Sequence, residues 1–225
     1  SDVGSSDLQT EYPFNETIRI SVRPAREATF PLSFRIPGWC RAAELNVNGR
    51  PLDVSPDARG FVRVERRWKP GDALTLRFPM TVRVERGRDA NADGAPWAAV
   101  SYGPLLFALP IAERESPNTP DPAARWSYAL DVRGDANPAS VRVQHEPMPA
   151  RWNWPLAAPL KLRVPAVAID WTPTPEAPRL PPEPIDANKP PETLTLVPYC
   201  CTKFRVSMFP VTRRAWDPAA ESCSK

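Results

Sequence analysis

The sequence predicts an all-β protein made of two antiparallel β-sandwich domains, jelly-roll-like in type, with little or no helix. Short runs in which apolar and polar residues alternate recur along the chain, and such runs are typical of strands with one buried face. Turn residues separate the runs at regular spacing, as in antiparallel sandwiches. The 225 residues include 31 prolines, and because proline disrupts helix interiors, almost no stretch of ten residues is free to form a helix.

The first sandwich is expected over residues 1–94. Its alternating runs lie at residues 17–22, 29–36, 44–47, 51–54, 61–64, 73–78 and 81–85. Asn48-Gly49 joins two of these runs and is the strongest short hairpin signal, because both residues tolerate a positive φ. Three tryptophans at strand ends are expected to pack at the rim or against a neighbouring domain: Trp39, Trp68 and Trp97.

The second sandwich is expected over residues 95–225, after a polar, turn-rich boundary at 87–95. Its strands are predicted within residues 97–109, 126–132, 140–143, 160–168 and 193–212. In the last of these, alternation predicts one inward face that includes Leu194, Leu196, Phe204, Val206 and Met208. The proline-rich stretch 170–191 suits an extended surface excursion, and residues 213–225 are expected to form a frayed tail.

Composition excludes several classes of protein. The formal charge is only +3, from 29 basic and 26 acidic residues, and the basic residues are dispersed rather than gathered in a patch. We therefore expect no nucleic-acid partner. No apolar run approaches the ~18 residues that a transmembrane helix needs, so we expect no membrane partner.

The cysteines invite a metal or redox interpretation, but their spacing argues against it. Cys200 and Cys201 are adjacent, whereas Cys40 and Cys223 lie far away in the sequence. Zinc needs three or four ligands, usually spaced cysteines and histidines, and the single histidine, His145, has no cysteine near it in the sequence. We therefore expect buried or partly buried thiols, no metal site and no cysteine nucleophile, and we expect His145 at a strand end.

A sugar platform is the one binding hypothesis that the residues suggest. Trp152 and Trp154 stand two positions apart, so on a strand both indoles would face one side, where the CH face of a sugar ring could stack. The alternative interpretation is packing in the core or between domains. The acidic residues lie mostly in loops and no pair is marked out as the acid and base of a glycosidase.

Eight stretches, in order along the chain, carry a resemblance to a known family. They read TEYPF at 10–14, LSFRIPGWC at 32–40, VNG at 47–49, GFVR at 60–63, WKPGD at 68–72, FPM at 78–80, YGPL at 102–105 and LVPYCCTKFRVSMFP at 196–210. Together they resemble the C-terminal β-sandwich region of the β-L-arabinofuranosidase family, glycoside hydrolase family 127, and its relatives. The chain departs from the family pattern at Cys200, where the residue is usually glycine.

The resemblance implies a large helical (α/α) barrel followed by two β-sandwiches, of which this chain covers only the sandwiches. It also implies that the chain begins just short of the opening strand of the first sandwich and is a fragment or processed product. The family's cysteine nucleophile, zinc ligands and acid/base glutamate belong to the barrel, and no stretch here matches them. We therefore expect no catalytic residue and no cofactor in this chain.

The resulting hypothesis is a non-catalytic accessory region of a glycoside hydrolase. The barrel of the parent enzyme would be its partner, and the sandwiches would brace it and shape the entrance for substrate. Two alternatives stay open. One is a carbohydrate-binding module that uses Trp152 and Trp154 to hold a glycan, and the other is a structural interaction domain that binds no sugar.

Overall fold

The computed structural model describes residues 5–90, 94–114, 119–152, 157–171 and 180–216. The chain is all-β, as predicted, and every strand pair in its sheets is antiparallel. The helical structure of the described residues is limited to the short 3-10 turn η1 (Tyr199–Cys201), and nothing in them has the length and apolarity of a membrane-crossing helix. Residue contacts divide the chain into two units, Ser1–Met80 and Thr81–Lys225.

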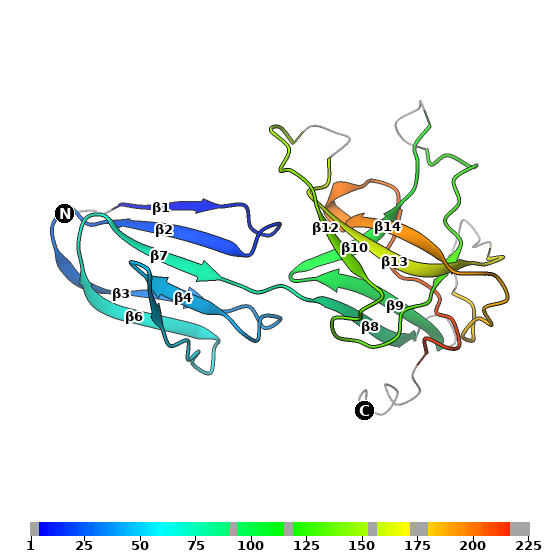
Figure 1. Ribbon diagram of the computed structural model, residues 1–225, viewed down its shortest axis with the longest axis horizontal. Helices are drawn as coiled ribbons and strands as arrows, with labels where there is room; N and C mark the ends of the chain where they lie inside the picture. The colour runs from blue at the N-terminus through cyan, green and yellow to red at the C-terminus, as the bar shows by residue number, and fades with distance from the viewer. Residues whose placement is uncertain (1–4, 91–93, 115–118, 153–156, 172–179, 217–225) are drawn as a thin grey trace. The chain divides into compact units, whose positions relative to one another are not determined.

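The first unit contains two sheets that share one core (Figure 1). A five-stranded sheet has the order β1-β2-β7-β4-β5, and β3 pairs with β6 in a second sheet. The strands are β1 (Ser5–Thr10), β2 (Thr17–Arg23), β3 (Ala28–Arg35), β4 (Glu44–Val47), β5 (Arg50–Leu52), β6 (Phe61–Trp68) and β7 (Asp72–Arg77). Apolar residues from both sheets make up the core, which is the arrangement of a sandwich.

The predicted hairpin at Asn48-Gly49 is confirmed. These two residues connect β4 to β5 with φ angles of 51° and 78°. Asn48 also ties the hairpin to the turn before β7, because its side-chain amide donates to the Asp72 carboxylate at 2.8 Å and its carbonyl accepts from the Ala73 N–H at 2.9 Å. The Lys69 N–H donates to the other Asp72 oxygen at 3.0 Å. The bonds from Lys69 and Asn48 favour the ionised carboxylate and lower the pKa of Asp72.

Trp68 contradicts its assignment to the rim. Its indole is 0% exposed, at the centre of the first core, and its Nε1–H donates to the Phe30 carbonyl at 2.9 Å. Trp39, by contrast, is half-buried and meets Phe78 edge to face, with ring centroids 6.3 Å apart. Trp68 ends β6 opposite Ala28, and this pairing with β3 turns the indole inward. The sequence shows that Trp68 lies at a strand end, but it does not show on which side the indole lies.

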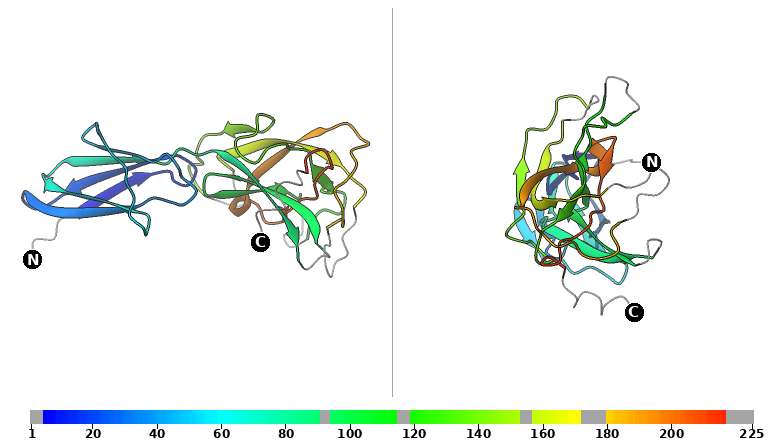
Figure 2. Two further views of the ribbon diagram at one scale, coloured as in Figure 1. Left: turned by 90° about the horizontal axis from the view of Figure 1, so that it is seen from below. Right: turned by 90° about the vertical axis from the view of Figure 1, so that its right-hand side faces the viewer.

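The second unit is built on a sheet with the order β11-β13-β14-β10-β9-β8, to which β12 adds beside β13 and β15 beside β10. Figure 2 shows the yellow and orange strands β13 and β14 beside the green β10. The strands are β8 (Val82–Asp89), β9 (Ala95–Tyr102), β10 (Leu105–Pro110), β11 (Tyr128–Leu130), β12 (Arg142–His145), β13 (Leu160–Ala168), β14 (Glu192–Pro198) and β15 (Arg205–Val206). The alternating residues of β13 point inward as predicted, since Leu160, Leu162 and Val164 are all 0% exposed.

The expected boundary between residues 94 and 95 does not coincide with the division between the units. β8 pairs with β9 along its whole length, from Val82 opposite Tyr102 to Asp89 opposite Ala95. The ends of the polar stretch at 87–95 therefore lie in two paired strands of one sheet. The division between the units lies instead between Met80 and Thr81.

The last part of the chain follows the predicted alternation only up to η1. Leu194 and Leu196 are buried as expected, but Met208 is 43% exposed, so the prediction of an inward face at Met208 is wrong. Phe209 and Val211 are buried instead, because they bridge to Ala98 and to the β11 residue Leu130.

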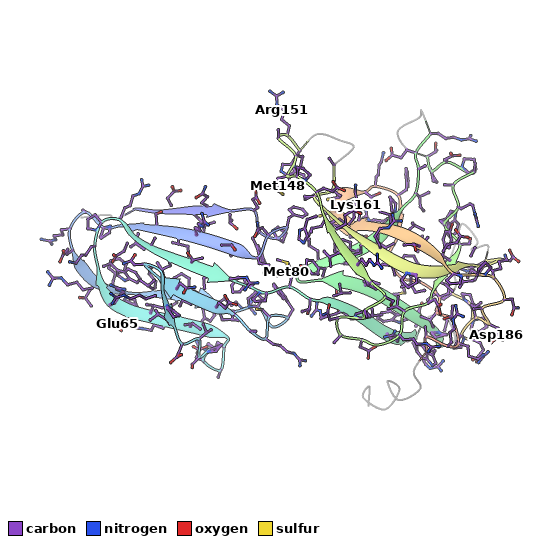
Figure 3. The ribbon with its side chains drawn as sticks, in the orientation of Figure 1. Glu65, Met80, Met148, Arg151, Lys161 and Asp186 are labelled. Atoms are coloured by element: carbon purple, nitrogen blue, oxygen red, sulfur yellow. The ribbon has the colours of Figure 1, made fainter. Side chains whose placement is uncertain are left out.

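The proline-rich excursion and the tail are more closely packed than predicted. Residues 172–179 and 217–225 lie outside the described residues, but Leu180 is buried and Ile185 bridges to Thr212. Asp186, labelled in Figure 3, accepts from Arg213 Nε at 2.8 Å. Arg214 donates to Asp131, so residues 213–216 are held by ion pairs and hydrogen bonds rather than frayed.

Candidate binding site in the second unit

The tryptophan pair predicted as a sugar platform is described only in part. Trp152 is 47% exposed and follows Arg151, which Figure 3 shows on the loop beyond β12. Trp154 lies outside the described residues. The pairing of these two indoles on one face therefore stays a prediction.

The cysteines do not form a catalytic or metal-binding cluster in the described residues. Cys40 and Cys201 are buried as predicted, whereas Cys200 is exposed, and all three are free thiols. The sulfurs of Cys200 and Cys201 are 3.9 Å apart. Burial, with a smaller effect of Cys200, raises the pKa of the Cys201 thiol to about 12. Cys223 lies outside the described residues, within which no three His, Cys, Asp or Glu side chains converge as metal ligands.

His145 ends β12, as predicted, and is exposed. Its ring meets Tyr102 edge to face, with centroids 6.5 Å apart. This contact places the His145 ring against the end of β9.

An open hollow of about 630 Å³ lies over the segment that contains η1. The Arg205 guanidinium stacks on Tyr199, with Cζ 3.6 Å from the ring centroid. Its Nη1 donates to the carbonyls of Thr202 at 2.6 Å and Lys203 at 3.0 Å. These contacts hold the guanidinium in place, and they cover one face of the tyrosine ring.

A second, narrower cavity of about 350 Å³ lies beside the hollow, with Arg205 common to both. We call it the aromatic cavity. It is lined by Asp89, Ile111, Trp126, Trp171, Leu180, Arg205, Val206, Ser207 and Met208. Its walls are therefore mainly apolar, with an acid, a base and a hydroxyl among them.

Backbone pairing brings the two tryptophans of the aromatic cavity together. Trp126 precedes β11 and Trp171 follows β13, and these strands are antiparallel neighbours. Hydrogen bonds extend the ladder beyond the strand ends, since the Ile169 N–H donates to the Ser127 carbonyl at 3.0 Å and the Ser127 hydroxyl donates to the Trp171 carbonyl at 2.5 Å. The indoles consequently meet edge to face, with centroids 5.6 Å apart and planes at 69°.

The opposite wall comes from the pairing of β10 with β15. Pro110 stands opposite Arg205, and the ladder continues as the Ile111 N–H donates to the Phe204 carbonyl at 2.8 Å. Asp89, at the end of β8, and Leu180, which packs with Trp171, complete the cavity. Every lining residue except Leu180 thus lies on a paired strand or within three residues of one.

Sequence reasoning missed Trp126 and Trp171 as site residues because they are far apart in the chain. A signal was present: one tryptophan begins the strand predicted at 126–132, and the other follows the strand predicted at 160–168. If these two strands pair in antiparallel fashion, both tryptophans must lie at the same end of the pair. The sequence does not say which strands pair.

Residues 5–80 match the family model of the β-L-arabinofuranosidase GH127 middle domain. This match covers the whole described part of the first unit and confirms the resemblance to glycoside hydrolase family 127 there. No curated protein matches the sequence.

Three solved structures share the fold over almost the whole chain. A GH127 β-L-arabinofuranosidase from Geobacillus stearothermophilus T6 is 24% identical with a TM-score of 0.59, over 93% of this chain and 31% of that one. A protein described as a glycoside hydrolase is 22% identical with a TM-score of 0.62, over 93% and 32%. A GH127 β-arabinofuranosidase is 20% identical with a TM-score of 0.61, over 96% and 32%. The chain thus spans about a third of the length of these structures.

Proposed function

We propose that this chain is a non-catalytic accessory region of a glycoside hydrolase related to the β-L-arabinofuranosidases. Its sandwiches would brace the catalytic (α/α) barrel of the parent enzyme and shape the entrance for substrate. The observation that carries the proposal is the match of residues 5–80 to a domain described as the middle domain of such an enzyme. The three similar structures support it, because each is about three times as long as the part that this chain matches.

The chemistry of the described cysteines also supports a non-catalytic role. The thiolate is the reactive form of cysteine, and a pKa of about 12 keeps the Cys201 thiol protonated at neutral pH. Cys200 is exposed beside it, and in the described part of the chain its sulfur contacts the Cys201 sulfur at 3.9 Å rather than a histidine that could act as a base. The residues of the described chain do not suit a zinc site either, since no three ligands converge.

The direct test is hydrolysis by the chain alone. The 225-residue protein should release no p-nitrophenol from an aryl β-L-arabinofuranoside above the buffer rate. Native mass spectrometry with metal analysis should find no stoichiometric zinc. Hydrolysis that disappears in a Cys200→Ser or Cys201→Ser variant, or a bound zinc that disappears in either, would refute the accessory role and place a catalytic site in this chain.

A carbohydrate-binding module is the second candidate, and the exposure of Trp152 favours it. If Trp152 and Trp154 form a platform, the double change to alanine should abolish binding to an immobilised arabinan and leave the near-UV circular dichroism unchanged. Retained binding would exclude this platform. A structural domain without sugar binding would show no binding before or after the change.

A further inference from the structure

We propose that the aromatic cavity is a binding site for a neutral sugar, with the sugar ring seated against the indoles of Trp126 and Trp171. The accessory role requires no ligand of its own, so this site is an additional function. It also differs in place from the platform at Trp152, which lies on a different loop and does not line the cavity.

The size and lining of the cavity suit a small molecule. Its volume of about 350 Å³ lies in the ~300–1,000 Å³ range of ligand pockets, which are typically apolar with a few polar groups that orient the ligand. Ile111, Leu180 and Met208 supply the apolar part of the wall, together with the two indoles. Both indoles are half-buried, so each is held in place and still reaches the cavity surface.

The polar groups indicate which class of molecule would fit. A sugar presents an apolar CH face, which can pack on an indole, and hydroxyls that both donate and accept hydrogen bonds. Asp89 offers only acceptors when ionised, Arg205 offers only donors, and the Ser207 hydroxyl offers both. The Asp89 carboxylate would repel an anion, and the Arg205 guanidinium would repel a cation. This mixed set of polar groups therefore favours a neutral polyhydroxylated ligand.

Arg205 is prepared for such a contact. Stacking on Tyr199 and the two bonds from Nη1 fix its guanidinium before any ligand binds, which reduces the entropy that binding would cost. Its Nε–H is buried and has no hydrogen-bond partner among the described residues. Because this N–H is sealed from solvent, a ligand would have to bind the other guanidinium N–H groups.

The neighbouring hollow is less suitable for a sugar ring. Its one aromatic side chain, Tyr199, already carries the Arg205 guanidinium on its face. The other side chains that line the hollow are Cys200, Thr202 and Lys203, which offer no apolar plate for stacking. The hollow is therefore the alternative location that the variants below must distinguish from the aromatic cavity.

The first experiment uses the unaltered chain. Its eight tryptophans each give an indole N–H signal in a ¹⁵N-correlated NMR spectrum, and Trp→Phe variants assign the signals of Trp126 and Trp171. L-arabinose, D-galactose and D-glucose are titrated separately. At least one sugar should shift these two signals with a saturable midpoint on the order of millimolar, as expected for one small ligand, and leave buried Trp68 unmoved.

Two outcomes of the titration would overturn the proposal. One is the absence of saturable shifts at Trp126 and Trp171 with all three sugars. The other is a set of saturable shifts confined to other tryptophans, such as Trp152. Both outcomes are read on the unaltered protein, so neither depends on whether a variant folds.

The second experiment locates the binding energy. Trp171→Ala and Asp89→Asn should each weaken binding at least about ten-fold, the equivalent of losing one good contact. Trp152→Ala, outside the cavity, should bind within about two-fold of the unaltered chain. Asp89→Asn keeps the size of the side chain and so decides the matter if Trp171→Ala fails to fold. Full affinity in Asp89→Asn together with lost affinity in Tyr199→Ala would place the ligand in the hollow and refute the proposal.

These results are independent of the accessory role. Sugar binding without hydrolysis leaves the accessory role intact. Hydrolysis by the chain would contradict the accessory role but would leave the NMR evidence on the cavity unaffected. If the chain neither hydrolyses nor binds sugar, only the proposed sugar site in the aromatic cavity is refuted.

Discussion

The central position of Trp68 makes Trp68→Phe the sharpest test of the first core. The indole is fully buried and donates to the Phe30 carbonyl at 2.9 Å. Phenylalanine keeps an aromatic ring in the site but has no donor, and it is smaller than the indole. The change therefore removes one buried hydrogen bond and leaves a void beside Phe30, whose ring centroid lies 6.1 Å from that of Trp68.

The expected loss of stability follows from these two effects. An abandoned buried acceptor costs ~1–3 kcal/mol, and the void adds about 1 kcal/mol, so the free energy of unfolding should fall by about 2–4 kcal/mol. For a unit of this size, Ser1–Met80, that loss corresponds to a decrease in Tm on the order of 10–30 °C. Total stabilities are commonly only ~5–15 kcal/mol, so the effect should be large.

Hydrogen exchange read by mass spectrometry is the appropriate assay, because it separates the two units. Peptides from β3 and β6 should exchange faster in Trp68→Phe, and peptides from β13 and β14 should not change. Trp152→Phe is the matched control, since Trp152 is 47% exposed and should cost less than about 0.5 kcal/mol. A Trp68→Phe protein within about 0.5 kcal/mol of the unaltered chain would refute the buried, hydrogen-bonded indole.

Three further predictions concern a carboxylate, a glycine and the adjacent thiols. Because the pKa of Asp72 is lowered in the folded protein, its ionised carboxylate stabilises the first unit above the unfolded pKa of about 3.9. This contribution should be lost as the pH falls towards the folded pKa. In urea unfolding from pH 6 to pH 3, the free energy of unfolding should therefore fall less in Asp72→Asn than in the unaltered chain. Gly87→Ala should destabilise the second unit by ~1–3 kcal/mol, because a Cβ there would lie 2.7 Å from the Trp97 ring, as thermal unfolding would show. Iodoacetamide at pH 8 should modify exposed Cys200 in the native protein well before Cys201, whose thiol is buried with a pKa of about 12, as peptide mass spectrometry would show.

Each of these predictions has an outcome that contradicts it. An unchanged acid dependence in Asp72→Asn would mean that this carboxylate titrates normally. A fully stable Gly87→Ala would mean that the Trp97 indole does not lie against the strand. Equal modification rates for the two cysteines, in the absence of denaturant, would contradict the burial of Cys201.

The strands and their inward faces could be predicted because alternation is a local property of an extended backbone. Successive side chains of a pleated strand point to opposite faces. The shared inward face of Leu160, Leu162 and Val164 can therefore be predicted without knowing which strand pairs with theirs. The hairpin at Asn48-Gly49 is equally local, because it depends on the φ angles that two residues tolerate. These predictions agree with the structure.

The sequence by itself therefore determined the all-β class, most strand positions and the resemblance of the first unit to a domain of glycoside hydrolase family 127. Only the tertiary structure decided that β8 pairs with β9, that Trp68 is central rather than peripheral, and that Trp126 and Trp171 form a cavity. The physical reason is that pairing and burial depend on contacts between residues far apart in the chain. A periodic pattern shows which side of a strand is apolar, but it does not show which other strand, or which end of it, will lie against that side.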